Sequence, residues 1–177
     1  MSQQTWMLIG IILTAGLVQG ISGFGFGLFA MGVMVLLMPT TDAVVIVAFT
    51  SLVSIALNVW SISKETPGRE VWPIIATAIP TSILGVLLLE HIPAQTLRVG
   101  IAIMILVGCA VSLWQPNRAL IRRAFPSAYL VGLTSGFLGG LLNMGGPPIV
   151  LYALLRGWDK NVSKGVISAT FLATGIL

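Results

Sequence analysis

The amino-acid sequence predicts an all-α membrane protein whose chain crosses the bilayer several times. Hydrophobic residues make up 56% of the 177 residues and charged residues only 8%, with a mean hydropathy of +1.03. Soluble domains carry charge on about a quarter of their residues, so the composition excludes a soluble fold. The apolar residues form long unbroken runs rather than alternating segments of about ten residues, which favours helices over a transmembrane barrel.

The first apolar run, from Trp6 to Met38, is too long for one membrane-spanning helix. As a single helix it would measure about 50 Å, whereas the hydrocarbon core of a bilayer is about 30 Å thick. We expect the helix to break within Ser22–Gly27, because the glycines there disfavour a helix interior. The remaining single segments are expected at Ala43–Ile62, Val71–Leu89, Ala94–Trp114 and, as a short last piece, Gly165–Leu177.

The second long apolar run, residues 126–155, contains the glycine-rich stretch Gly132–Pro148. Gly145 and Gly146 allow a sharp turn, and Pro147 suits the first position of a new helix. Irregular backbone at membrane depth is tolerated only where protein or a cavity surrounds it, and in transporters it commonly lines a binding site. This run therefore predicts a second broken helix.

A glycine pattern repeats along the chain. Gly-Leu-x-x-Gly-x-x-Gly occurs at residues 16–23 and again at 132–139, an offset of 116 residues, and both copies open a broken run. The pattern indicates an internal duplication, with residues 1–125 as the first transmembrane repeat and its closing basic loop. Residues 126–177 then form the start of a second repeat, which we expect to be incomplete. The alternative is that both copies are small-residue faces for close helix packing.

Lysine and arginine suggest how the repeats face. They concentrate in the connections at 63–70, 115–125 and 156–164, whereas the turns at 39–42 and 90–93 contain none. Because cytoplasmic loops carry the Lys/Arg excess, all three basic connections are expected inside. The second broken run must then cross the bilayer an even number of times, as a re-entrant segment or a hairpin. If the first run behaves alike, the two repeats are inverted relative to each other.

The two breaks are the candidate binding site. A half-helix that begins inside the membrane presents unpaired N–H groups and its positive dipole end, so two converging ends can hold an anion without a charged side chain. Buried amides near the breaks can complete the site, whereas serine and threonine on the following spans more often bond their own helix. The candidate substrate-binding residues are Gln19, Ser22, Gly23, Gly25, Ser135, Asn143, Gly145, Gly146 and Pro147.

Several other functions find no support in the sequence. No nucleophile–base pair or metal-ligand cluster is visible, so we expect no enzyme activity, cofactor or metal. The basic residues are scattered through short connections, which does not indicate a nucleic-acid partner. No carboxylate lies clearly within a span, so the sequence identifies no coupling ion. The first residues lack a basic segment before the apolar run, so we expect no cleaved signal peptide.

The segments Gly20–Gly27 and Gly139–Pro148, with the order of spans between them, resemble the TauE/SafE family of bacterial sulfite exporters and anion permeases. The resemblance covers essentially the whole chain and implies a multi-pass inner-membrane transporter built from an internal duplication. It also implies small sulfur-containing anions, such as sulfite and organosulfonates, as substrates. Members of the family continue for further spans, which agrees with the expectation of an incomplete second repeat.

Two functions follow from the sequence. One is a transporter of a small anion, in which the two breaks enter the lipid bilayer from opposite faces and form the binding site. The other is a non-transporting membrane subunit or assembly factor, in which the glycine motifs serve helix packing alone. The sequence leaves the oligomeric state open, including a homo-oligomer.

Overall fold

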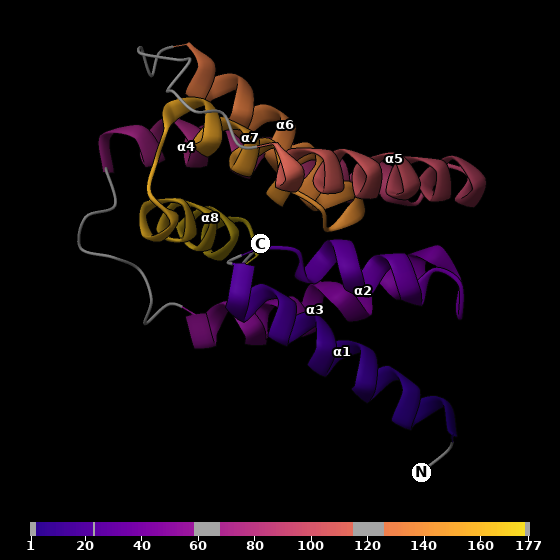
Figure 1. Cartoon of the computed structure of the whole chain (residues 1–177). Helices are drawn as coiled ribbons and strands as arrows, with labels where there is room; N and C mark the ends of the chain where they lie inside the picture. Colours follow the sequence, from indigo (N-terminus) through magenta and orange to yellow (C-terminus); the bar gives the residue numbers. More distant parts are fainter. Residues whose placement is uncertain (1–2, 23, 59–67, 115–125, 176–177) are drawn as a thin grey trace.

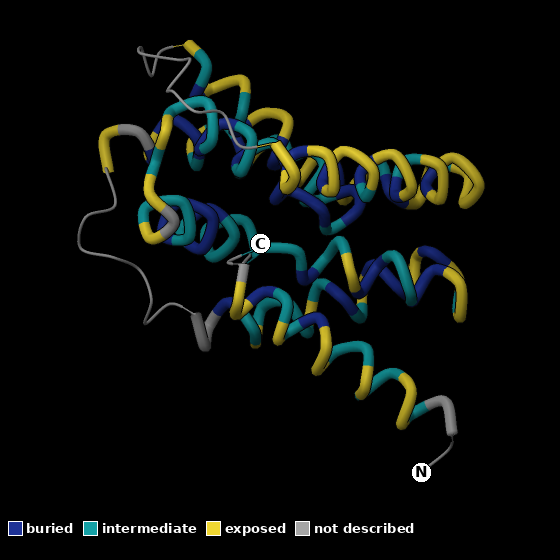
Figure 2. Tube along the Cα trace, viewed as in Figure 1, coloured by how far each residue is buried: buried dark blue, intermediate teal, exposed yellow. Residues whose placement is uncertain are grey.

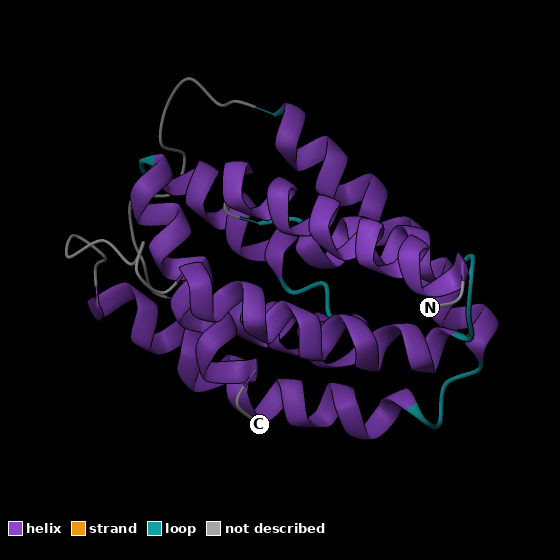
Figure 3. Ribbon diagram, turned by 90° about the horizontal axis from the view of Figure 1, so that it is seen from below, coloured by secondary structure: helices purple, strands orange, loops and turns teal. Residues whose placement is uncertain are grey.

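The computed structural model describes residues 3–22, 24–58, 68–114 and 126–175, and these segments are almost entirely helical (Figures 1 and 3). The predicted all-α class is confirmed, since no strand occurs among the described residues. The helices of this part of the chain are α1 (Gln3–Ser22), α2 (Phe26–Met34), α3 (Thr40–Asn58), α4 (Gly68–Leu89), α5 (Ala94–Leu113), α6 (Ser127–Leu142), α7 (Gly146–Arg156) and α8 (Lys160–Gly175).

The helices have the lengths and surfaces of a membrane protein. Val71–Leu89 of α4 and Ala94–Leu113 of α5 are long and apolar enough to cross a bilayer, and parts of α1, α3 and α6 are shorter apolar helices. Figure 2 shows exposed positions along the outer sides of these helices, and many carry large apolar side chains, such as Leu36 at 81% and Leu113 at 85% exposure. Such surface is costly in water but not against lipid tails.

Both long apolar runs break where the sequence predicts. In the first, α1 ends at Ser22 and α2 begins at Phe26; in the second, α6 ends at Leu142 and α7 begins at Gly146. The chain turns through left-handed conformations, with φ 99° at Gly25 and φ 54° at Asn143. Glycine adopts this region freely and asparagine more readily than most residues. These residues therefore stop one helix and redirect the chain into the next.

The helix boundaries recur at a spacing that differs from the glycine offset. Three pairs of boundaries lie 120 residues apart: the ends Ser22 and Leu142, the starts Phe26 and Gly146, and the starts Thr40 and Lys160. This spacing exceeds the 116-residue offset by four residues, about one helical turn. In the longer register Gly16 and Gly20 correspond to Gly136 and Gly140. The duplication itself remains a prediction, in a register one turn longer than the glycine pattern indicates.

Glycine lets α4 and α6 pack with their backbones close together. A Cβ added to Gly136 would collide with the carbonyl oxygen of Ala78 and the hydroxyl of Thr81, and one added to Gly140 would collide with the carbonyl of Ser82. Gly85 of α4 is equally confined by the backbone of α6. This is the small-residue packing that the sequence offers as its alternative reading, and it holds for α6. On α1, by contrast, Gly16 and Gly20 face open space.

The buried side chains form two groups that join distant parts of the sequence. One group brings α1, α2 and α3 together with α5 and the end of α6, around residues such as Met31, Met34 and Leu142. The other joins α4, α7 and α8 around Ile74 and Tyr152. Helices α3 and α8 also pack against each other, as do α5 and α7. Helices from both halves of the sequence therefore surround the two breaks.

Three predicted helix starts are wrong: α3 and α4 each begin three residues before the predicted Ala43 and Val71, and the last helix differs most. The sequence places a basic connection over residues 156–164 and starts the last segment at Gly165, but α8 already begins at Lys160. Lys164 therefore lies within the helix, and its Nζ donates to the carbonyl oxygen of Gly20 at 3.1 Å. The ammonium group thus satisfies a carbonyl near the C-terminal end of α1, where helices leave such groups unpaired.

The close contact of α4 with the glycines of α6 predicts that Gly→Ala substitutions change protein stability unequally in α1 and α6. We expect Gly136→Ala to lower the stability of the purified protein by about 1–3 kcal/mol, because the new methyl group must push α4 away from α6. Gly16→Ala, the corresponding change on α1, should leave the melting temperature unchanged or slightly raised, since nothing lies within 4 Å of the added carbon. Thermal unfolding in detergent measures both variants. Equal melting temperatures for the two would contradict the assigned packing.

Candidate binding site at the helix breaks

The two breaks lie against each other. A Cβ added to Gly27, in the first turn of α2, would collide with the carbonyl oxygen of Asn143, so no side chain fits between these backbones. On the other side of the contact, the position of a Cβ on Gly146 lies 3.8 Å from the side chain of Phe24. Segments more than 100 residues apart in sequence are thus in direct contact. The two breaks are therefore in contact, and their role as an anion-binding site stays a prediction.

A cavity of about 630 Å³ extends from this contact. It is bounded by α1, α2, α3, α4, α6, α7 and α8, and none of its lining residues is charged. Its polar side chains are few, and most of its wall is apolar. The polar side chains that line it are Gln19, Ser51, Ser82, Asn143 and Thr174. A ligand in this cavity would meet amides, hydroxyls and backbone groups, but no lysine, arginine or carboxylate of the described residues.

Gln19 is the most buried amide of the cavity, with only 4% of its surface exposed. Its Oε1 accepts a hydrogen bond from Ser54 Oγ at 2.7 Å, which joins α1 to α3. With the oxygen engaged in this way, the NH₂ group of the amide is the donor left to face the cavity. Gln19 thus lies in the cavity wall, and its role in substrate binding stays a prediction.

Asn143 has a structural task as well as a place in the cavity wall. Its N–H donates to the carbonyl of Gly139 at 2.9 Å and, with φ at 54°, it closes α6 as a left-handed cap. Its Nδ2 lies 3.4 Å from Ser51 Oγ, a long hydrogen bond that connects the second break to α3. A test of its amide must therefore keep a residue that tolerates the left-handed backbone.

The remaining predicted residues divide into two groups. Gly25, Gly146 and Pro147 line the cavity. Ser135 and Gly145 do not line it. Ser135 is 2% exposed, and its Oγ donates to the Gly145 carbonyl at 2.7 Å. This hydrogen bond joins α6 to the second break. Gly23 and the side chain of Ser22 lie outside the described residues.

The starts of the two half-helices differ in their capacity to donate. α7 begins at Gly146, so Pro147 occupies its second position rather than the predicted first, and Pro148 its third. Neither proline has an N–H, which leaves α7 with few donors at its start. In α2 the first residues Phe26, Gly27 and Leu28 all line the cavity, and their N–H groups have no partner inside the helix. The start of α2 is therefore the stronger dipole end facing the cavity.

Sequence reasoning missed several contributors to this region. Thr174 and Phe171 of α8 and Ser82 of α4 line the cavity, but in sequence they look like ordinary span residues. As expected for hydroxyls in spans, Thr50 and Thr174 donate to carbonyls of their own helices, at 2.7 and 3.0 Å. Ser51 Oγ likewise donates to the carbonyl of Ala48 at 2.8 Å, and it also accepts the hydrogen bond from Asn143 Nδ2. A hydroxyl that already donates to its helix presents only its lone pairs to the cavity.

The described helices have an apolar outer surface, and two broken helices meet beside a cavity, which is the architecture of a membrane transport protein. Comparison with known families agrees with this class. The family described as "Sulfite exporter TauE/SafE" matches residues 8–177, and the chain belongs to this family. The resemblance noted in the sequence is confirmed.

The chain is also similar to a curated protein of this family. The protein described as "Probable sulfite/organosulfonate exporter TauE" of Cupriavidus necator is 27% identical to this chain over 139 residues. The match covers 75% of this chain and 54% of the relative, so the chain spans about half the length of that protein. No solved structure matches the chain.

Proposed function

We propose that the chain acts in the membrane transport of small anions, with sulfite or organosulfonates as the substrates. The observation that carries this proposal is the direct contact of two broken helices beside a cavity without charged lining residues. Membership of the exporter family and the printed name of the relative support the substrate class. The relative is about twice as long as the matched part of this chain, so transport by this chain alone belongs to the proposal.

The site would hold an anion through dipoles rather than through a full charge. The first residues of α2, Phe26, Gly27 and Leu28, line the cavity, and a helix N-terminus carries roughly half a positive charge. The amides of Gln19 and Asn143 add side-chain donors from α1 and α6. A site of this kind binds an anion without the slow release that a buried, fully charged lysine would impose. Weak multi-point binding suits a substrate that must leave again.

We further propose inverted repeats in a bacterial inner membrane, with the three basic connections in the cytoplasm. Arg156 at the end of α7 and Lys160 at the start of α8 belong to the third connection. Lys164 is four residues into α8, about 6 Å along its axis, and contacts Gly20. In this topology the first break lies toward the cytoplasmic side of the bilayer, and Lys164 lies near it.

The proposed topology predicts which reagents reach α8. In a chain whose native Cys109 is replaced by serine, a cysteine in place of the exposed Asn161 should react with a membrane-impermeant maleimide only after the inner membrane is opened. A cysteine in place of Glu90, in the exposed turn between α4 and α5, should react with the same maleimide in intact spheroplasts. Labelling of position 161 in intact spheroplasts would contradict inverted repeats.

The second candidate function is a non-transporting subunit in which glycine serves packing alone. The confined contacts of Gly136 and Gly140 against α4 favour this reading for one face of α6. They do not account for Gly25 and Asn143, which hold left-handed backbone at the breaks and line the cavity. The two functions differ in whether a small anion binds the folded chain.

Anion-dependent melting tests the transport function. A ligand that binds only the folded protein adds about 2.7 kcal/mol at roughly 100 times its Kd. We expect sulfite or an alkylsulfonate to raise the melting temperature of the purified protein more than sulfate or chloride at equal ionic strength. Asn143→Gly, which keeps the left-handed cap, and Gln19→Leu should lose about 1.4 kcal/mol of this stabilisation for each tenfold loss of affinity.

The matched control is Thr134→Val, because the Thr134 hydroxyl is exposed and donates to its own helix at Leu130. This variant should keep the full anion-dependent shift. Efflux of labelled sulfite from proteoliposomes then separates transport from binding. Absence of any selective shift in the parent protein would refute the anion site and leave the packing function.

A further inference from the structure

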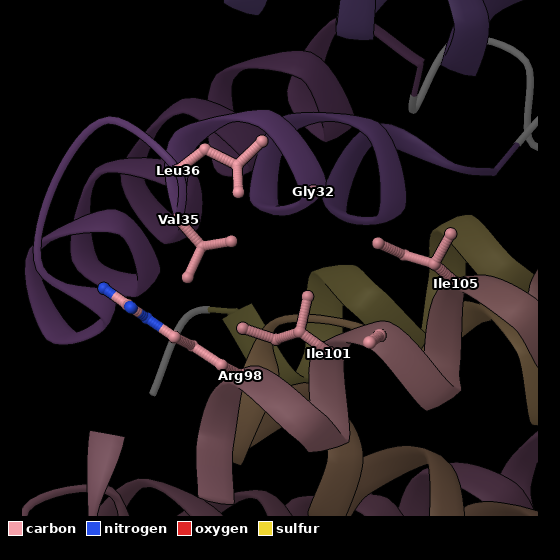
Figure 4. A pocket seen from close by; sticks show the side chains of 7 residues that line it. Gly32, Val35, Leu36, Arg98, Ile101 and Ile105 are labelled. Carbon is pink, nitrogen blue, oxygen red and sulfur yellow. The ribbon is translucent and has the colours of Figure 1, made fainter. Parts of the chain in front are cut away.

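We propose that the groove between α2 and α5 is a binding site for an anionic phospholipid, with Arg98 contacting the phosphate. The groove has a volume of about 320 Å³ and shares no lining residue with the cavity at the breaks. It is lined chiefly by Gly32, Val35, Leu36, Arg98, Ile101 and Ile105. Figure 4 shows the apolar side chains of the two helices facing one another across it.

Arg98 is the single charged residue among those that line the groove. It is exposed, and within the described parts of the chain no carboxylate forms an ion pair with it. In Figure 4 its side chain extends from α5 toward the ribbon that carries Val35, so the guanidinium lies at one end of the groove. An arginine in this position offers a planar set of donors that matches the oxygens of a phosphate.

The location of Arg98 along α5 places it at headgroup depth. α5 begins at Ala94, so Arg98 lies about one turn inside a helix that is long and apolar enough to cross a bilayer. An arginine near the end of such a helix keeps its charge at the membrane interface while its stem lies along apolar surface. The guanidinium is therefore level with lipid phosphates rather than with the acyl chains.

The rest of the groove suits an acyl chain. Gly32 lets α2 and α5 approach closely at the base of the groove, because a Cβ at that position would lie only 3.0 Å from Ile105 Cδ1. Leu36 is 81% exposed and borders the groove on the α2 side. A free inorganic anion would pair with Arg98 but gain nothing from these apolar walls. A phospholipid uses both features, because its phosphate and its hydrocarbon are joined in one molecule.

An arginine at headgroup depth attracts an anionic phosphate, and one Lys or Arg near an anionic membrane surface contributes about 1 kcal/mol to binding. The site therefore predicts about a fivefold preference for phosphatidylglycerol over phosphatidylcholine with the same acyl chains. Native mass spectrometry of the purified protein, titrated with each lipid, measures this ratio directly.

Two variants and one control define the test. Arg98→Gln should bind both lipids equally, since it removes the charge and keeps a polar side chain with hydrogen-bond donors. Ala102→Trp, which fills the groove from an exposed lining position, should weaken both lipids. Arg69→Gln removes an exposed arginine at the start of α4, away from the groove, and should keep the fivefold preference.

Three results would overturn the proposal. A retained preference in Arg98→Gln would show that another group selects the headgroup. Unchanged lipid binding in Ala102→Trp would show that the groove does not hold the acyl chain. Displacement of phosphatidylglycerol by inorganic phosphate alone would identify a free-anion site rather than a lipid site. None of these outcomes depends on whether the chain transports an anion.

Discussion

A helix that stops in apolar surroundings leaves backbone N–H and C=O groups that lipid cannot satisfy, and in this chain two helices stop within long apolar runs. Each stop is covered by the other. The carbonyl oxygen of Asn143 packs directly against Gly27, and the side chain of Phe24 lies beside Gly146. The hydroxyl of Ser135 donates a hydrogen bond to the carbonyl of Gly145. The contacts among α2, α3, α6, α7 and α8 follow from this requirement, because helices from both halves must surround the breaks. The residues that start α2 line a cavity beside this contact.

Glycine serves two separate purposes in this arrangement, and they occur at different residues. Gly136 and Gly140 allow α4 and α6 to touch along their backbones. Gly25 instead permits a left-handed turn, and Gly27 permits the approach of the second break. A packing role explains the first pair completely but not the second. A protein that needed only close helices would have no reason to interrupt two of them at the same place.

The positions of the breaks followed from the sequence because a single helix would be far longer than a bilayer is thick. The glycines of α6 at 132, 136 and 140 are spaced by four, so Gly16 and Gly20 match glycines at an offset of either 116 or 120 residues. The glycine pattern of the predicted repeat therefore does not select between these two registers. Ser135 lies in the predicted stretch, yet its bond to Gly145 turns it away from the cavity. The contact of Lys164 with Gly20 joins residues 144 positions apart and leaves no local signal. Tertiary contacts of this kind decide which polar residues of a span face the cavity.

The central claim is that a small anion enters the cavity at the breaks. Ser51 lines this cavity and is bonded to Asn143, so a cysteine there reports directly on its contents. In a protein with Cys109 replaced by serine, Ser51→Cys should react with a small maleimide, and ethanesulfonate should slow the reaction. Thr14→Cys, at an exposed position of α1 outside the cavity, should react at the same rate with and without ethanesulfonate. Equal reaction rates at position 51 with and without the anion would contradict the account.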